Sequence, residues 1–409
     1  MRQYEVKSTV WSNPRLWAVS LGETLAWAGL FYLFPASLIR WKLHFDWSIS
    51  ELSGALMIAL IMSAITGIGS GKLIDKGLGR ELISGGVVLG GVCLLFIPMV
   101  SSLEEFYILW AVVGIAMGTC LYDPCFAILT RHYSSEAKEP IVMVTLFAGF
   151  SITFSFILSA LIASVFNWET SFYVFGVLLC FLAAPLFWIG IPVDTKIKPL
   201  AARIFSESKS LVSFFRELIM KPIFWGLSIL FTTFALNHIM LISQILPLFE
   251  NKGVSSTSAV LMASAMGPMQ VGGRMALLAM EKYLQKEFEI IRVASFSCVA
   301  LVCASGLLYY SEKNPLILGL FVVLQGGAFG IINLVKPVIT ARLLGELNFG
   351  FVSAVVGVGY IFGFAVAPGV SGFISDAWGS DRLIGTTFLL ALVGFGMFSL
   401  SATRKVNRK

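Results

Sequence analysis

The chain has 409 residues, of which 57% are hydrophobic and only 13% are charged, and its formal net charge is +6. A soluble protein of average composition carries about 25% charged residues, so this composition excludes a soluble globular protein. It predicts an integral membrane protein that crosses the bilayer many times. The six cysteines all fall in predicted spans, without the spacing of a disulfide framework or of zinc ligands. We therefore expect no metal site and no cofactor.

Twelve apolar stretches are long enough to cross a bilayer, which takes about 20 residues in a helix. We predict spans at residues 16–39, 48–70, 82–100, 106–129, 141–165, 171–192, 222–248, 256–280, 290–310, 315–340, 349–373 and 383–402. We expect the first span to remain as an anchor, because nothing before it resembles a cleavable signal peptide. The predicted fold class is an all-α membrane protein with twelve transmembrane helices.

The longest polar interruption, residues 193–221, divides the spans into two groups of six. It predicts an N-terminal half at 1–192, a cytoplasmic linker, and a C-terminal half at 222–409. The linker contains six Lys and Arg residues, and its apolar residues recur at helical spacing at Leu211, Phe214, Phe215 and Leu218. This pattern favours a short amphipathic helix that lies on the membrane surface.

The basic residues are distributed unequally between the two sets of loops. The predicted loops on the side of the termini contain 21 of the 29 Lys and Arg residues, and those on the other side contain 5. Cytoplasmic loops carry an excess of Lys and Arg, so both termini are predicted to be cytoplasmic. We expect a monomer in the plasma membrane, which is the inner membrane in a bacterium. The net positive charge is explained by topology, and no nucleic-acid partner is expected.

The loop after the second span reads Gly-Lys-Leu-Ile-Asp-Lys-Gly-Leu-Gly-Arg at residues 71–80. This stretch resembles the signature of the major facilitator superfamily, Gly-x-Leu-x-Asp-Arg-x-Gly-Arg-Arg/Lys. The matching positions are Gly71, Leu73 and Asp75, with Lys76 in place of Arg. At the end of the motif, either Leu78 stands where Gly is expected, or one residue is inserted and Gly79 and Arg80 are the Gly-Arg pair. The span count and the position of the linker extend the resemblance over the whole chain.

The resemblance implies a transporter that works by alternating access, with two six-helix halves. It also implies that Asp75 helps to lock one conformation at the cytoplasmic face, with Arg131 as its expected partner. An ordinary charged turn is the alternative interpretation of this loop.

The two halves share a motif in their fourth spans: two glycines four residues apart, then a charged residue followed by proline. The motif consists of Gly114, Gly118, Asp123 and Pro124 in one half, and of Gly326, Gly330, Lys336 and Pro337 in the other. Glycines at this spacing let helices approach closely. The charge is negative in the first half and positive in the second.

Ionisable side chains inside predicted spans are expensive, by about 2.5–3.5 kcal/mol on insertion scales, and they mark functional sites or buried pairs. They are Glu23, Asp123, His238, Arg274 and Lys336. In the family that this chain resembles, the first, fourth, seventh and tenth helices line a central cavity, and four of these residues fall on those helices.

Two roles remain open for Glu23 and Asp123. Either residue could carry the coupled proton, or both could form a gate by pairing with Lys336 and Arg274. The candidate substrate-binding residues are Lys336, Arg274, His238, Asn237, Asn333 and Tyr122. Their cations favour an anionic or zwitterionic solute.

The sequence thus predicts a proton-coupled transporter of a small organic solute. An exporter of drug-like or secreted metabolites is the alternative within the same class. A non-transporting receptor or scaffold is the alternative from another class. No nucleophile or metalloprotease motif is present, so we do not expect an enzyme.

Overall fold

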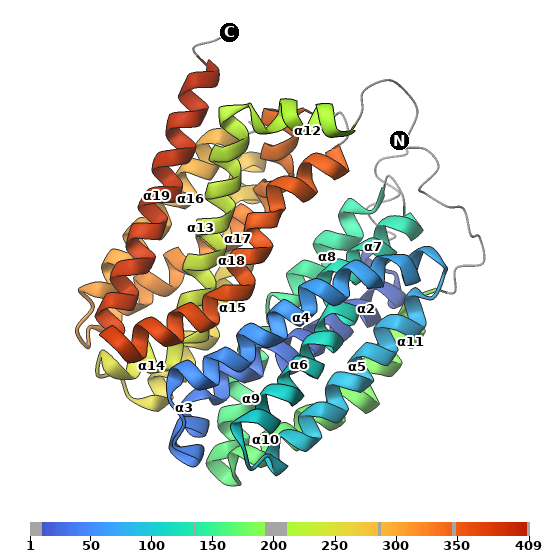
Figure 1. Cartoon of the computed structure of the whole chain (residues 1–409), viewed down its shortest axis with the longest axis vertical. Coiled ribbons are helices and arrows are strands. Elements are labelled where there is room, and N and C mark those ends of the chain that lie inside the picture. The colour runs from blue at the N-terminus through green and yellow to red at the C-terminus, as the bar shows by residue number, and fades with distance from the viewer. Residues whose placement is uncertain (1–9, 134–135, 193–210, 285–287, 346–348, 407–409) are drawn as a thin grey trace. The chain divides into compact units, whose positions relative to one another are not determined.

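The computed structural model describes the chain except for residues 1–9, 134–135, 193–210, 285–287, 346–348 and 407–409. The described residues form helices and connecting turns, with no β-strand among them. They make up two compact units, unit 1 at Met1–Leu200 and unit 2 at Ala201–Lys409 (Figure 1). The boundary falls within the predicted linker.

Unit 1 contains long helices that are interrupted in places by a wider or a tighter turn. Its elements are α2 (Pro14–Trp27), the π-helical turn η1 (Ala28–Tyr32), α3 (Leu33–Phe45), α4 (Ile49–Asp75), α5 (Gly79–Phe96), η2 (Ile97–Met99), α6 (Leu103–Cys120), α7 (Tyr122–Tyr133), α8 (Lys138–Ala148), α9 (Ser151–Val165), α10 (Trp168–Leu178), the π-helical turn η4 (Leu179–Ala183) and α11 (Ala184–Gly190).

Unit 2 has fewer interruptions. Its elements are α12 (Leu211–Ile219), α13 (Pro222–Ser243), α14 (Ile245–Asn251), α15 (Ser256–Leu284), α16 (Ile290–Tyr309), α17 (Pro315–Leu344), α18 (Phe349–Trp378) and α19 (Ser380–Val406). The short helix α12 coincides with the apolar pattern predicted in the linker, and Leu218 is buried. Residues 193–210 of the linker lie outside the described residues.

Several helices begin where the sequence supplies a cap for the free N–H groups of the first turn. Side chains that cap in this way belong to Asn13, Ser48, Ser102, Asn167 and Asn314. Ser48 forms a full capping box with Glu51. Proline occupies the start of α2, α13 and α17, where its missing N–H costs no hydrogen bond.

Eleven helical segments of the described chain are long and apolar enough to cross a membrane. The remaining predicted span, 256–280, coincides with α15, a helix of 29 residues that contains Pro268. Its polar residues, among them Gln270 and Arg274, make it less apolar than the others. The fold is therefore that of a multi-pass integral membrane protein with two six-helix halves.

Three predicted spans divide into two α-helices at residues outside any helix. The span predicted at 141–165 divides at Gly149 and Phe150, between α8 and α9. The span predicted at 106–129 breaks at Leu121, which is the residue between α6 and α7. The span predicted at 222–248 ends at Ser243, and Gln244 separates it from α14. Apolar length predicted all three stretches correctly as membrane segments, but it does not report local breaks in a helix.

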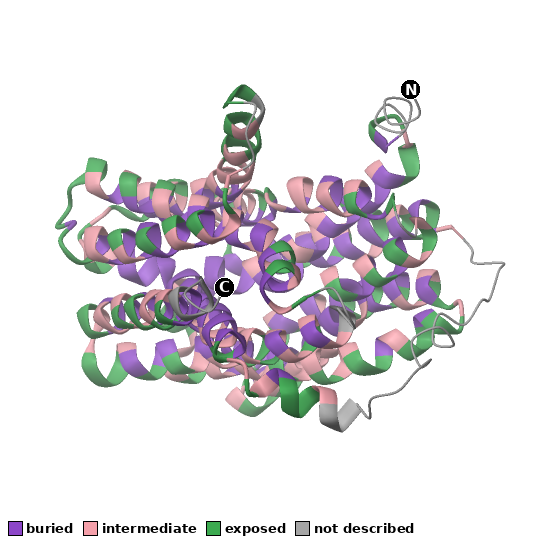
Figure 2. Cartoon of the chain, turned by 90° about the horizontal axis from the view of Figure 1, so that it is seen from above, coloured by how far each residue is buried: buried purple, intermediate pink, exposed green. Residues whose placement is uncertain are grey.

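Most helices carry buried residues on one side and exposed residues on the other (Figure 2). The exposed sides are themselves apolar. Among their residues are Ile68, Val358, Phe362 and Leu389, each more than 60% exposed. Apolar surface on this scale is unfavourable in water and is the surface that lipid covers.

The glycine pairs of the repeated motif lie at close helix crossings. A Cβ at Gly114 would collide with the backbone of Ala59, so α6 and α4 touch backbone to backbone there. In unit 2, a Cβ at Gly330 would collide with the backbone of Gln270, where α17 crosses α15. The predicted close approach is thus present in both halves.

Candidate functional site

The fourth span of unit 1 is broken just before its charged residue. Leu121 has extended backbone angles, with ψ at −162°, so helical hydrogen bonds are lost around it. The carbonyl of Gly118 instead accepts a hydrogen bond of 2.8 Å from the Ser70 hydroxyl of α4. The proline at 124 has no N–H and favours such a break.

The break brings Tyr122 and Asp123 into the first turn of α7. Asp123 is exposed and Tyr122 is half-buried, whereas Pro124 and Cys125 are buried. A charged side chain does not face hydrocarbon without a large cost. The side of α7 that carries Asp123 therefore faces water or protein rather than lipid.

Glu23, on α2, is completely buried. Neither of its carboxylate oxygens has a hydrogen-bond partner among the residues that the structure describes. The Trp27 indole and the Cys125 thiol lie beside it without hydrogen-bond geometry, and Asp123 is near enough to interact electrostatically. An unpaired charged carboxylate in such surroundings is costly, so proteins either pair the group or neutralise it with a proton.

Aromatic rings connect the two acidic positions. The Trp27 ring lies 4.7 Å from the Tyr122 ring, and the Tyr122 ring stacks on Phe126 at 4.9 Å. The structure thus brings Glu23, Asp123 and Tyr122 together in unit 1, from α2 and α7.

The signature loop lies between α4 and α5. Arg131 of α7 reaches it, with Nη1 3.5 Å from Asp75 Oδ1 and 3.3 Å from the Asp75 carbonyl oxygen. Arg80 stacks its guanidinium 3.9 Å from the centre of the Trp188 ring. Gly71 lies near the end of α4, and Lys76 is the residue that follows this helix. The expected contact between Asp75 and Arg131 is present, and its role in locking a conformation remains a prediction.

In unit 2, Arg274 of α15 contacts the repeated motif. Its Nε donates a hydrogen bond of 3.0 Å to the Gly330 carbonyl oxygen on α17. This is the same position in the motif as Gly118 in unit 1. The guanidinium therefore has a structural contact with a helix backbone in addition to its predicted role in substrate binding.

Asn237 and His238 belong to a buried polar network that joins four helices. The Asn237 amide nitrogen donates to the Thr387 carbonyl oxygen at 2.9 Å and to Ser305 Oγ at 3.3 Å, and its oxygen accepts from Gln325 Nε2 at 3.0 Å. Gln325 also lies 3.5 Å from His238 Nδ1. Both sides of the Asn237 amide are therefore satisfied by protein.

His238 is held mainly by a ring contact. Its imidazole stacks on Phe329 with ring centres 3.4 Å apart, and it is 1% exposed. The Gln325 side-chain oxygen has no hydrogen-bond partner among the described residues. It is the acceptor of this network that remains available.

Lys336 lies on α17, one residue before Pro337, and is half-buried. Its ammonium is 3.8 Å from the centre of the Tyr360 ring and 5.9 Å from that of Phe231. Cation–π contacts of this kind stabilise a cation that has little water around it. Asn333, one turn earlier, is also half-buried, and the missing N–H of Pro337 removes the helical partner of its carbonyl.

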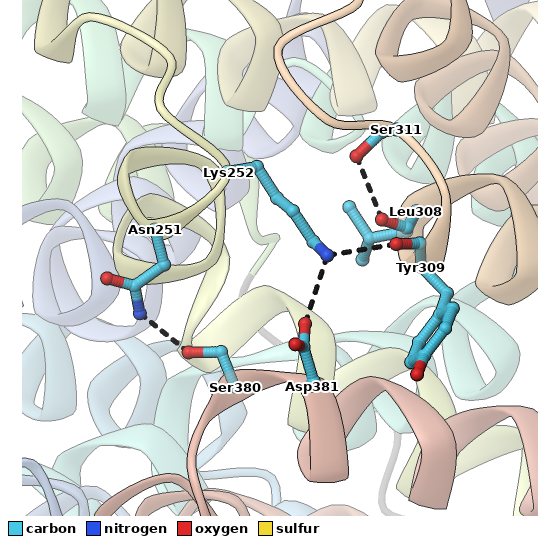
Figure 3. A network of polar contacts seen from close by, with 7 residues as sticks. All are labelled: Asn251, Lys252, Leu308, Tyr309, Ser311, Ser380 and Asp381. Carbon is cyan, nitrogen blue, oxygen red and sulfur yellow. Dashed lines mark hydrogen bonds and ion pairs between the residues drawn. The ribbon is translucent and has the colours of Figure 1, made fainter.

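The loops at the predicted outer end of unit 2 are tied together by Lys252 (Figure 3). Its ammonium donates to the Tyr309 carbonyl oxygen at 2.9 Å and lies 3.0 Å from Asp381 Oδ1. Asn251 and Ser380 form a second bond between the same two helix ends. Three connections of unit 2 are thus held at one point.

The sequence model of the Major Facilitator Superfamily matches residues 16–321. The chain belongs to the major facilitator superfamily. Two solved structures show the same fold. A bacterial homologue of the human lysosomal transporter Spinster, in an inward-facing and unoccupied conformation, aligns with a TM-score of 0.74 at 17% identity, over 95% of this chain and 96% of that one.

The second structure is the nucleoside transporter NupG, with a TM-score of 0.68 at 14% identity, over 94% of this chain and 99% of that one. No curated protein sequence matches the chain. At these identities, the likeness of this superfamily member to both transporters shows a shared fold only. The family indicates membrane transport rather than enzymatic activity.

Several residues around these sites carried no signal in the sequence. Tyr360 and Thr387 are ordinary span residues until the fold places them beside Lys336 and Asn237. Ser70 lies between Gly69 and Gly71, and nothing in the neighbouring sequence marks it as the donor of a hydrogen bond to another helix.

Proposed function

We propose that this superfamily member is a secondary transporter that couples the movement of a small organic solute to the proton gradient by alternating access. Glu23 is the proposed proton site. The observation that carries the proposal is the burial of its carboxyl group with no hydrogen-bond partner among the described residues. A carboxyl group in this setting can bind a proton when closed off and release it when water reaches it.

Asp123 is the less favourable candidate for the proton site because its side chain is exposed. We assign it to the gate. Tyr122, on the same turn and stacked against Trp27 and Phe126, provides a ring at the same surface.

Lys336 is the proposed contact for a negative group of the solute, which supports an anionic or zwitterionic substrate. Its ammonium lies 3.8 Å from the centre of the Tyr360 ring, and a positive charge within a membrane span attracts a carboxylate or phosphate. Asn237 and His238 are proposed polar contacts from α13; they are joined to Gln325, whose buried oxygen has no hydrogen-bond partner among the described residues. Asn333 lies one turn before Lys336 on α17, and Arg274 of α15 contacts Gly330 on the same helix.

The experiment begins with a solute. Purified protein is screened for thermal stabilisation by a library of small carboxylates, amino acids and nucleosides at pH 6 and pH 8. A solute whose stabilising effect changes with pH is linked to proton binding. That solute is then used in proteoliposomes with an imposed pH gradient.

Glu23→Gln is expected to abolish accumulation driven by the pH gradient while solute exchange at equal pH continues. Asp123→Asn is the comparison, and it should keep gradient-driven accumulation. Accumulation that persists in Glu23→Gln contradicts the proton assignment. Loss of both exchange and accumulation in either variant indicates a gate instead. The direction of the gradient that drives accumulation distinguishes uptake from export.

A further inference from the structure

Unit 1 contains two groups of aromatic side chains that differ in exposure. The first group packs around Trp41 and is completely buried; it includes Trp41, Phe106, Trp110 and Phe172. The second group is only half-buried; it consists of Trp27, Tyr32, Tyr122 and Phe126. We call this second group the aromatic wall. The buried rings fill the interior of the unit, whereas the wall keeps ring surface that another molecule can cover.

The rings of the aromatic wall contact one another in sequence. The Trp27 ring centre lies 6.2 Å from that of Tyr32 and 4.7 Å from that of Tyr122, and Tyr122 stacks on Phe126 at 4.9 Å. These separations are typical of interacting aromatic pairs. Tyr32 and Tyr122 take part in further interactions as well. The rings are therefore held in place before a ligand arrives, which lowers the entropy cost of binding.

Tyr32 reaches the wall because α2 is followed by the wider turn η1. The Leu33 N–H bonds to the carbonyl of Ala28, five residues earlier, so residues five apart lie on the same side of this turn. In an α-helix of about 3.6 residues per turn, residues five apart point about 140° away from each other. Trp27 and Tyr32 are five residues apart. The π-helical turn, a feature frequent at functional sites, thus brings the Tyr32 ring beside Trp27.

The aromatic wall adjoins the two acidic residues of unit 1. Asp123 is exposed and lies three residues before Phe126, on the same side of α7. Because a charged side chain does not face hydrocarbon without a large cost, this side of the wall faces water or protein rather than lipid. At the other side, Trp27 lies beside Glu23. Exposed rings in a setting that excludes lipid are suited to bind a solute.

We propose that the aromatic wall binds a flat aromatic ring of the transported solute. This inference rests on the proposed transport function, and it narrows the anionic or zwitterionic solute to a zwitterion that carries an aromatic ring. A flat ring stacks offset or edge-on against the rings of the wall, whereas a saturated ring of the same size is puckered and cannot. Asp123 repels a negative group and attracts a positive one, which favours a zwitterion over a simple anion.

The test measures solute binding to the full-length protein in detergent, without a gradient, from thermal unfolding followed by light scattering at increasing solute concentration. The probes form two pairs of zwitterions that differ only in the ring: phenylalanine with cyclohexylalanine, and para-aminomethylbenzoate with its cyclohexane counterpart. We expect the aromatic member of at least one pair to bind about threefold to tenfold more tightly than the saturated member, as for one additional ring contact. Phenylpropionate, which lacks the ammonium group of phenylalanine, should bind more weakly than phenylalanine.

Tyr32→Leu is expected to remove the preference for the aromatic member. Phe126→Leu is the second variant should Tyr32→Leu not fold, and it should reduce the preference as well. Tyr173→Leu is the matched control, because Tyr173 is a tyrosine of unit 1 that is 39% exposed and lies outside the wall. It should leave the preference unchanged.

The proposal is overturned if the saturated members bind as tightly as the aromatic ones, or if none of the probes binds. Equal weakening of both members of a pair in Tyr32→Leu also overturns it, because the ring preference would then come from elsewhere. Phenylpropionate that binds as tightly as phenylalanine overturns the choice of a zwitterion. Since no gradient is used, a failure of proton coupling leaves these results intact. Conversely, gradient-driven accumulation of a solute without an aromatic ring overturns this inference while the proposed function stands.

Discussion

The two halves support the crossing of their fourth spans in the same place but with different chemistry. In unit 1 the carbonyl of Gly118 accepts a hydrogen bond from a serine hydroxyl, and in unit 2 the carbonyl of Gly330 accepts one from the Arg274 guanidinium. The shared element is a carbonyl at the second glycine of the motif. The comparison teaches that both halves keep a side-chain hydrogen bond to this carbonyl oxygen. The donor is neutral in unit 1 and charged in unit 2.

The halves also differ in the surroundings of the buried polar residue on their first membrane-spanning helix, which is α2 in unit 1 and α13 in unit 2. Glu23 of unit 1 is buried without a hydrogen-bond partner among the described residues. Asn237 of unit 2 is buried with three. A satisfied network stabilises a fold, whereas an unsatisfied carboxyl group is kept at a cost to stability. That contrast is why we assign the proton to unit 1.

The largest expected effect comes from closing the space at the helix crossing. Gly330→Leu places a side chain where the Gln270 backbone lies, and we expect the protein not to be recovered as a folded monomer by size-exclusion chromatography. Gly114→Leu should have the same result in unit 1. Gly319→Leu is the control on the same helix, because nothing lies within 4 Å of a Cβ there, and it should fold normally.

A smaller loss of stability is expected when Arg274 is replaced by serine, the residue type that makes the equivalent contact in unit 1. Arg274→Ser removes the bond to the Gly330 carbonyl, and a hydrogen bond from a charged group is worth about 1.5–3 kcal/mol. Ser70→Ala removes the equivalent neutral bond, worth about 0.5–1.5 kcal/mol. Thermal unfolding in detergent measures both.

Arg292→Ser, at a side chain that is 85% exposed, is the control for loss of an arginine. It should leave the unfolding midpoint nearly unchanged. If Ser70→Ala costs as much as Arg274→Ser, the charged contact has no special role in unit 2.

Substitutions of the buried polar residues on α13 and α2 are expected to change the stability of the protein in opposite directions. Asn237→Leu leaves Gln325 and the Thr387 carbonyl without their partner, at a cost of about 1–3 kcal/mol. Glu23→Leu removes an unsatisfied buried group and should raise the unfolding midpoint, although transport is lost. The contrast fails if both substitutions destabilise the protein equally.

The smallest effect is expected at the loops shown in Figure 3. Asp381→Asn weakens the contact with Lys252, but Asp381 is 70% exposed, so water and salt screen the pair. We expect a loss of about 0.2–1 kcal/mol at low salt. The difference from the unsubstituted protein should shrink at 1 M NaCl; an effect that does not depend on salt would point to the backbone bonds instead.

Apolar length was sufficient to predict the membrane segments, because each must satisfy its backbone hydrogen bonds within a helix of bilayer length. The glycine pairs also predicted the close crossings correctly, since only glycine allows backbones to touch. The breaks at Leu121 and Gln244 were not predicted. At Leu121 the break is accompanied by the hydrogen bond from Ser70 to the Gly118 carbonyl, and Ser70 comes from another helix.

The roles of the charged residues were less predictable than their existence. The sequence identified Glu23, Asp123, Arg274 and Lys336 as unusual, because an ionisable group in an apolar run always needs an explanation. It could not separate the buried Glu23 from the exposed Asp123. Nor could it show that Arg274 reaches a backbone carbonyl, since 56 residues separate the two partners.

By itself the sequence determined that this protein is a membrane-embedded bundle built from two related halves, with acids in the first and cations in the second. These properties follow from composition and spacing along the chain, which the bilayer and helix geometry translate directly into structure. Only the tertiary structure decided that Glu23 is buried without a hydrogen-bond partner among the described residues. It also decided that Lys336 lies against an aromatic ring and that Arg274 contacts the backbone of a neighbouring helix. Burial and pairing depend on side chains brought together from distant parts of the chain, and no local pattern records them.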